Sequence, residues 1–275
     1  MKTELAVEEA TVRGYPSGPG SYAAVMSHID DTTAKGYRGR TTFKDLCLDV
    51  NVVAPMADFW SAALGLRIQN RGNNVLLRDD VDEHAVWLNL VPEKKTVKQR
   101  VHLDVNTDAV ARLVGNGATV VDTSLPWTVL TDPEGGEFCA FVRSPEALTD
   151  YRSPEALTGY RLYEVVVDCA EPASIAGWWA AVLGLDTLAG DGEWSVGPGA
   201  GLPWELVFGA VPEAKTVKNR IHWDVWGETS ELLAAGATLL RARDGQLGDS
   251  LEDGQIGWDV LADPEGNEFC VFARD

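Results

Sequence analysis

An internal repeat constrains this chain more than any other feature of its sequence. Residues 91–105 read VPEKKTVKQRVHLDV, and residues 211–225 read VPEAKTVKNRIHWDV. Residues 132–141, DPEGGEFCAF, return in the same order as residues 263–272, DPEGNEFCVF. Two matching blocks in the same order mark a duplicated unit, and each unit has the length of a single domain. We therefore expect two homologous domains, over residues 41–143 and 160–275, after a flexible N-terminal segment over residues 1–40.

The segment between these domains, residues 144–159, is largely a smaller repeat. Residues 143–151 read RSPEALTDY and residues 152–160 read RSPEALTGY. Serine followed by proline is typical of a helix start, because serine caps the helix and proline is preset for its first turn. We expect a linker of two short helical turns without a catalytic role.

Charge excludes several classes of partner. The 275 residues include 42 acidic and 23 basic side chains, a formal net charge of −19. An acidic surface repels nucleic-acid phosphates and anionic membranes, so we expect neither as a partner. No apolar run approaches the roughly 20 residues of a membrane span.

Cysteine spacing and the N-terminal sequence bear on the compartment. The four cysteines lie far apart without a C-x-x-C pair, as in proteins of a reducing compartment. The first 40 residues lack the apolar core of a secretion signal. We therefore expect a cytoplasmic protein.

Hydrophobic periodicity divides each half into two similar modules. Residues 43–50 alternate as a strand does, and residues 57–64 have helical apolar spacing that ends at Gly65. Residues 86–90 and 101–105 are expected strands, followed by a helix over 108–114 and strands near 118–121, 128–130 and 137–142. The second half repeats this order. The sequence thus predicts an α+β fold of four βαβββ modules.

Strand alternation places polar residues together. In residues 100–105, Arg100, His102 and Asp104 share one face, and the apolar side chains share the other. Residues 220–225 repeat the pattern. The first strands add Asp45 and Glu164, and the last strands add glutamate and cysteine. Each half thus offers two carboxylates, a histidine and a cysteine for one face of a curved sheet.

On these motifs, the chain resembles the vicinal-oxygen-chelate superfamily, which includes glyoxalase I, bleomycin- and fosfomycin-resistance proteins and extradiol dioxygenases. The resemblance covers the chain outside residues 1–40 and 144–159. It is closest to a glyoxalase-like branch that carries V-P-E-x-K-T-V-K-N-R-x-H-x-D before D-P-E-G-N-E-F-C. It implies that the four modules form two tandem cup-shaped domains, each a site for a small organic molecule.

The resemblance also implies a metal site in each cup, held by a first-strand residue, a histidine and a last-strand glutamate. In this chain the last position holds cysteine. Such a set suits zinc and is a poor match to an iron site of two histidines and one carboxylate. Magnesium or manganese would need Glu137 or Glu268 instead. The implied ligands are Asp45, His102 and Cys139 in the first half and Glu164, His222 and Cys270 in the second.

Structural roles compete with these assignments. His102 and His222 fit a hydrogen-bonded cluster as well as a metal site, so binding without any metal stays equally open. Cys139 and Cys270 are more typical of small buried hydrophobic residues than of ligands. For the lysines of the repeated basic segments, pairing with surface acids is the favoured interpretation.

Other residues are candidates for ligand binding. Arg100 and Arg220 share the histidine face, which suits an anionic ligand. Trp87, Trp194 and Trp204 have no counterpart in the other half, so we expect them as stacking walls of a cup. The glycine-rich segment 190–201 is either a mobile flap or an ordinary loop.

Two classes of function follow. The first is a metal-assisted lyase, isomerase or hydrolase in which Glu137, Glu164 or Glu268 moves a proton. The alternative is a non-catalytic protein that sequesters a small molecule, as bleomycin-resistance proteins do. One half could also be only a scaffold, so that the other half alone has a working cup. The duplicated chain would be a monomeric pseudo-dimer or a homodimer.

Overall fold

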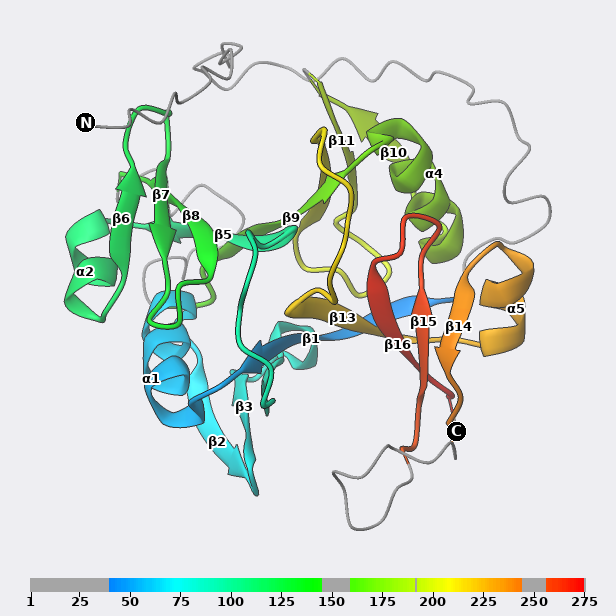
Figure 1. Cartoon of the computed structure of the whole chain (residues 1–275), viewed down its shortest axis with the longest axis horizontal. Coiled ribbons are helices and arrows are strands. Elements are labelled where there is room, and N and C mark those ends of the chain that lie inside the picture. The colour runs from blue at the N-terminus through cyan, green and yellow to red at the C-terminus, as the bar shows by residue number, and fades with distance from the viewer. Residues whose placement is uncertain (1–39, 145–158, 191, 244–255, 275) are drawn as a thin grey trace, which may run out of the picture.

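The computed structural model describes residues 40–144, 159–190, 192–243 and 256–274 (Figure 1). These residues form a mixed α+β fold of two eight-stranded sheets with helices packed against them. Nearly all of the expected N-terminal segment and linker lie outside the described residues. Within the described residues, no helix combines the length and apolarity needed to cross a bilayer.

The first half contains modules 1 and 2, as the sequence predicts. Strands β4 and β8 have the predicted bounds, and the other predicted elements differ by a few residues at their ends. The hairpin β2–β3, which had not been assigned, completes module 1. The elements of module 1 are β1 (Thr42–Val50), α1 (Val53–Leu64), β2 (Arg67–Arg71), β3 (Asn74–Arg78), the short η1 (Asp82–His84) and β4 (Val86–Leu90). Those of module 2 are β5 (Val101–Thr107), α2 (Val110–Gly115), β6 (Thr119–Asp122), β7 (Thr128–Thr131) and β8 (Glu137–Val142).

The second half repeats this order as modules 3 and 4, which confirms the prediction of four βαβββ modules. Module 3 comprises β9 (Leu162–Cys169), α4 (Pro172–Leu183), β10 (Thr187–Ala189), β11 (Glu193–Val196) and β12 (Glu205–Ala210). Module 4 comprises β13 (Ile221–Trp226), α5 (Thr229–Ala234), β14 (Thr238–Arg241), β15 (Asp259–Ala262) and β16 (Glu268–Phe272).

The two sheets do not follow the two halves of the sequence. The first sheet has the order β14-β15-β16-β13-β1-β4-β3-β2, which joins module 4 to module 1. The second has the order β10-β11-β12-β9-β5-β8-β7-β6, which joins module 3 to module 2. Strands β1 and β13 pair antiparallel at one junction, and β5 and β9 at the other (Figure 1). The ranges 41–143 and 160–275 therefore describe the duplication, not the pairing of strands.

The repeated basic segments explain this exchange. Residues 91–100 carry the chain from β4 in the first sheet to β5 in the second, and residues 211–220 carry it back from β12 to β13. We call these two segments the connectors. Because each connector changes sheets, Asp45 of the first half faces Asp224 of the second, and Glu164 of the second half faces Asp104 of the first. The expectation that each half supplies a complete face is corrected accordingly.

The Asp-Pro-Glu-Gly turns cap the first helix of each half. Residues Asn51 and Val52, where α1 begins, donate backbone N–H groups to the Glu134 carboxylate at 2.9 and 2.6 Å. The amides of Ala170 and Glu171 donate to Glu265 in the same way, at 2.8 and 2.7 Å. A carboxylate at this place satisfies amides that the helix leaves unpaired and interacts favourably with the helix dipole. The turn thus joins the two modules of one half.

The hydrophobic core lies between each sheet and its helices. Trp60 on α1 packs edge-on against Phe138 on β8, with ring centroids 5.4 Å apart. Trp179 on α4 packs in the same way against Phe269 on β16, at 5.0 Å. The helices cover the apolar faces of the strands, which leaves the polar side chains on the opposite face of each sheet. We call this the polar face.

Candidate functional site

The polar face of the first sheet brings together three possible metal ligands. Cys47 lies opposite His222 in the pairing of β1 with β13, and Asp224 lies two residues further along β13. One ligand atom from each residue lies within 4.8 Å of the others, and all three residues are buried. We call these residues the first cluster. Asp45 lies directly opposite Asp224.

The polar face of the second sheet carries a matching group. His102, Asp104 and Cys139 each offer a ligand atom, again all within 4.8 Å of one another. We call these residues the second cluster. His102 Nε2 and Asp104 Oδ1 are 3.4 Å apart. Glu164 on β9 lies directly opposite Asp104. His102 and Glu164 are half-buried, so this cluster is more open than the first.

Acidic groups crowd the first cluster. Burial, and next the negative charge of Asp45, raise the pKa of Asp224 well above its usual range. Lys44 Nζ offsets part of this charge at 2.5 Å from Asp45 Oδ2, and Trp87 Nε1 donates to the same oxygen at 3.1 Å. Burial lowers the pKa of His222 to about 4. The imidazole is therefore neutral at pH 7, as metal ligation requires.

Glu164 is the most perturbed carboxyl group near the second cluster. Burial, and then the charges of Asp104, Glu205 and Glu193, raise its pKa to about 9. Burial also raises the pKa of Asp104, against the charge of His102. Asp104 and Glu164 lie opposite each other, and like charges in a buried site disfavour double ionisation. The two carboxyl groups therefore share a proton.

The cysteines of both clusters are poor nucleophiles. Burial is the largest cause that raises the pKa of Cys47 and of Cys139, and adjacent carboxylates raise both further. The reactive form of cysteine is the thiolate, so thiols in this environment do not suit covalent catalysis. A bound cation reverses this balance, because a metal displaces the thiol proton. Sulfur, nitrogen and oxygen donors together match the ligands of zinc.

The last-strand glutamates lie elsewhere in the network. Glu137 accepts hydrogen bonds from Lys95 Nζ at 2.9 Å and from the Gln99 amide at 3.0 Å. Glu268 accepts the same pair of bonds from Lys215 and Asn219, at 2.7 and 3.1 Å. Both glutamates therefore anchor the connectors. Neither belongs to the donor groups in the part of the chain that the structure describes.

The family follows from the sequence of the two halves. The chain matches the family model of the glyoxalase-like domain over residues 45–141 and again over 164–272, together more than half of its length. It belongs to the glyoxalase-like domain family. This match confirms the resemblance to the vicinal-oxygen-chelate superfamily that the motifs implied. No curated protein is similar enough in sequence to match the chain.

Solved structures share this glyoxalase-like fold at low sequence identity. Glyoxalase I from Zea mays is 14% identical, with a TM-score of 0.56 over 84% of this chain and 92% of that chain. A mutant of the same enzyme is 15% identical, with a TM-score of 0.57 over 85% and 94% of the two chains. A putative dioxygenase from Bacillus subtilis subsp. subtilis str. 168 is 10% identical, with a TM-score of 0.54 over 86% of each chain. These likenesses concern the fold alone.

The arginines of this glyoxalase-like chain serve the connectors. Arg100 donates to the carbonyl oxygens of Glu213 at 2.7 Å and of Asp168 at 2.8 Å. Arg220 donates to the Glu93 carbonyl oxygen at 2.6 Å and lies 3.4 Å from the Glu134 carboxylate. Each arginine thus ties one connector to the other. Both guanidinium groups donate to backbone carbonyls, and their role as anion ligands stays a prediction.

Only one of the three unmatched tryptophans lies on a polar face. Trp87 faces Cys47 across β1 and β4. Trp194 lies opposite the buried Phe208 and packs against the core. Trp204 is fully buried and packs edge-on against Phe43, with ring centroids 5.1 Å apart. The prediction that Trp204 forms a ligand wall is therefore wrong, since its side chain is fully buried. Trp194 is half-buried on β11 and packs against the core.

The glycine-rich segment is not a free flap over its described residues. Residues 193–196 form β11, which pairs with β10 and β12. The Phe43 amide on β1 donates to the Ala200 carbonyl oxygen at 2.9 Å. A Cβ atom on Gly201 would lie 2.9 Å from the Phe43 carbonyl oxygen, and φ at this glycine is +85°. The segment therefore packs closely against the first strand of the other half.

A group of stacked aromatic rings, which we call the aromatic wall, adjoins each cluster. Trp127 stacks on Phe141 with ring centroids 5.6 Å apart, and Tyr163 lies 5.2 Å from the same ring. In the first sheet, Trp258 and Trp226 flank Phe272 at 5.2 and 5.9 Å. These rings are half-buried. Phe141 and Phe272 lie two residues after Cys139 and Cys270, so they share the cysteine face of β8 and β16.

Asp104, Asp224 and Cys47 were not among the predicted ligands, although Asp104 and Asp224 were expected on the histidine face. The resemblance predicted Asp45, Glu164 and the last-strand cysteines as ligands instead. The available signal was the period of two in the His-x-Asp motif, which puts both side chains on one face. The exchange of modules then decides which carboxylates meet across the strands, Asp45 with Asp224 and Glu164 with Asp104.

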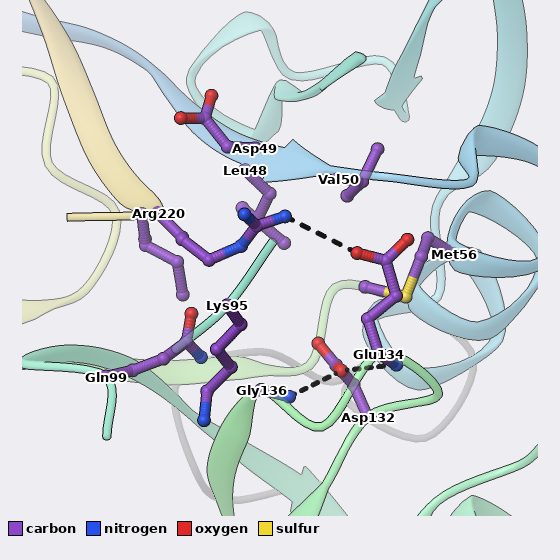
Figure 2. A pocket seen from close by; sticks show the side chains of 11 residues that line it. Leu48, Asp49, Val50, Met56, Lys95, Gln99, Asp132, Glu134, Gly136 and Arg220 are labelled. Atoms are coloured by element: carbon purple, nitrogen blue, oxygen red, sulfur yellow. Dashed lines mark hydrogen bonds and ion pairs between the residues drawn. The ribbon is translucent and has the colours of Figure 1, made fainter. Parts of the chain in front are cut away.

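A separate pocket lies on the apolar side of β1, beside α1 (Figure 2). Arg220 and Glu134 point toward each other across it, and Asp132 and Gly136 line its far side. In the second half Asn267 stands at the position of Gly136 and fills this space with hydrogen bonds to Asp263 and Asn219.

Proposed function

We propose that this glyoxalase-like protein is an enzyme whose reaction takes place at the second cluster. The observation that carries the proposal is the convergence of His102, Asp104 and Cys139 ligand atoms within 4.8 Å, directly beside Glu164. Catalytic zinc sites commonly combine three protein ligands with an open position. Half-buried His102 and Glu164 support access from solvent.

In this proposal the three residues of the second cluster hold a divalent cation, with zinc the best match to a cysteine ligand. Such an ion would polarise a carbonyl oxygen of the substrate. Glu164 takes the role of the group that moves a proton. It faces the cluster from the opposite strand. Its ionised carboxylate, made a stronger base by the raised pKa of about 9, would accept the proton that the α-carbon loses and return it to that carbon.

The aromatic wall of the second sheet has the role of binding the apolar part of the substrate. Trp127, Phe141 and Tyr163 offer flat, partly exposed rings. Arg143 lies over the Phe141 and Tyr163 rings, with its Cζ atom about 5 Å from each centroid, and holds them in place. The proposed substrate is therefore a small carbonyl compound with an apolar or planar part, and the reaction is proton transfer next to that carbonyl.

A second candidate is a non-catalytic protein that sequesters a small organic molecule. The aromatic walls on both sheets favour it, since ring stacking binds planar ligands without chemistry. So does the cysteine at the position where the family carries a glutamate ligand. The two functions differ in what happens to the hydrogen atoms of a bound carbonyl compound.

The test is hydrogen exchange in a small carbonyl probe. Hydroxyacetone is incubated in D2O with zinc-loaded, tag-free protein, and its exchangeable α-hydrogens are followed by NMR. The enzyme function predicts accelerated exchange that falls to the uncatalysed rate in His102→Ala and in Glu164→Gln. The matched control is His222→Ala, which changes the other sheet and should retain the acceleration.

Sequestration predicts a different outcome. Planar aromatic carbonyl probes such as benzoylformate would quench tryptophan fluorescence in a saturable manner, and no probe would exchange faster than in buffer. Exchange that survives both His102→Ala and Glu164→Gln would also refute the proposed site.

A further inference from the structure

The two clusters differ in closure, although duplication made them alike. In the first sheet, Cys47, His222 and Asp224 are 5%, 8% and 5% exposed. Asp45 and Cys270, at their edges, are 5% and 7% exposed. In the second sheet His102 and Glu164 are half-buried. The first cluster is therefore a sealed group of polar side chains.

Two substitutions between the halves account for the difference. His222 lies opposite Cys47, which in turn lies opposite Trp87. The corresponding residues of the second sheet are Val166, opposite His102, and Val207, opposite Val166. The first sheet thus gains a sulfur donor next to its histidine. It also gains an indole that lies over the strand and donates to Asp45.

Several buried atoms of the sealed group lack a hydrogen-bond partner among the described residues. They are Asp224 Oδ1, His222 Nδ1 and Asp45 Oδ1. Cys47 Sγ donates a weak hydrogen bond to Asp224 Oδ2 at 3.6 Å. Unpaired polar atoms in a buried site are costly, so these atoms indicate a missing partner. One ligand atom each of Cys47, His222 and Asp224 lies within 4.8 Å of the others, close enough to share one cation.

We propose that Cys47, His222 and Asp224 form a closed, structural site for a thiophilic divalent cation of the zinc type. Structural zinc sites are four-coordinate and have no open position, in contrast to catalytic ones. Asp45, opposite Asp224, is placed to complete the set through its unpaired oxygen. Cys47 is the residue that gives this site its preference for soft metals, and metal binding releases its thiol proton to solvent.

Cobalt substitution tests the site without any activity measurement. Co2+ bound to a thiolate gives a charge-transfer absorption in the near ultraviolet. Apo protein without an affinity tag is titrated with Co2+ in a His102→Ala background, which removes the histidine of the second cluster. The band should appear in this background, vanish on adding Cys47→Val and persist on adding Cys270→Val.

Cys47→Val is a matched replacement, because the second sheet carries Val166 at the same position. The Zn2+ affinity of this variant should fall by more than the roughly 10–100-fold that loss of an outer partner costs. Zn2+ should raise the melting temperature of the His102→Ala protein and of its Cys270→Val derivative, but not of its Cys47→Val derivative. Circular dichroism of each apo variant shows that the fold is retained.

Three results would overturn the proposal. The His102→Ala protein could show no cobalt band, the band could survive Cys47→Val, or it could be lost with Cys270→Val, which would assign the thiolate to the last strand. Each outcome leaves the function proposed for the second cluster in place. Failure of the hydrogen-exchange test, conversely, leaves the closed site of the first sheet unaffected.

Discussion

Removing the Glu134 carboxylate is the sharpest test of how the two modules of one half are held together. Helix α1 has no side-chain cap of its own at Val52, and Glu134 supplies one from the turn before β8. Loss of a side-chain cap costs about 0.5–2 kcal/mol, and a hydrogen bond to a charged group is worth about 1.5–3 kcal/mol. Two amides and Arg220 lose their acceptor, so we expect Glu134→Ala to lower the free energy of unfolding by about 3 kcal/mol.

Urea unfolding followed by tryptophan fluorescence measures this loss as a lower midpoint with an unchanged slope. Glu265→Ala, the equivalent change at α4, should cost a similar amount. Glu93→Ala is the control, because its exposed side chain is removed while the carbonyl that receives Arg220 stays. A midpoint for Glu134→Ala within error of the control would refute the capping role.

Three further predictions concern the turn and the connectors. The raised pKa of Asp132, about 6, means that the folded state binds its proton more tightly than the unfolded chain, whose Asp pKa is near 3.8. Stability should therefore fall by up to about 3 kcal/mol as pH rises from about 4 to about 6, and calorimetry should find a flatter profile in Asp132→Asn. A Cβ at Gly136 would lie 2.6 Å from Asp132 Oδ2 and 2.8 Å from Gln99 Nε2, so Gly136→Asn alone should destabilise. Adding Gln99→Asn reproduces the pair of Asn267 and Asn219 that the second half accommodates beside Asp263, and should recover about 1 kcal/mol. Equal melting temperatures for the single and double variants would contradict this. Arg220→Lys should lower the free energy of unfolding by about 1–2 kcal/mol, because lysine cannot reach both the Glu93 carbonyl and the Glu134 carboxylate. Quenching of tryptophan fluorescence by the carbonyl probe should not change. A loss of this quenching would support Arg220 as a ligand.

The local structure of this chain was predictable because each signal is local. Strand β8 carries its alternation over Glu137–Val142, and α1 ends at Gly65, whose φ is +74°. The hairpin β2–β3 had no such signal, since β2 is polar and largely exposed. The polar faces also followed from alternation alone.

Pairing between modules was not predictable, because duplicated modules offer equivalent strands. Nothing in the first strand states whether Asp45 meets Asp224 or Asp104. The connectors decide it, and their arginines act on backbone carbonyls that no sequence pattern reveals. Trp204 was misplaced for a similar reason, since a tryptophan without a counterpart can fill the core as well as line a cup.

The protein's central property is one donor group on each sheet, with each sheet drawing strands from both halves. Elemental analysis of tag-free protein, dialysed after zinc loading, measures this directly. The clusters predict two zinc ions per chain, one in His102→Ala, one in His222→Ala, and none in the double variant. A wild-type protein that retains no zinc, or single variants that each retain two ions, would contradict the account.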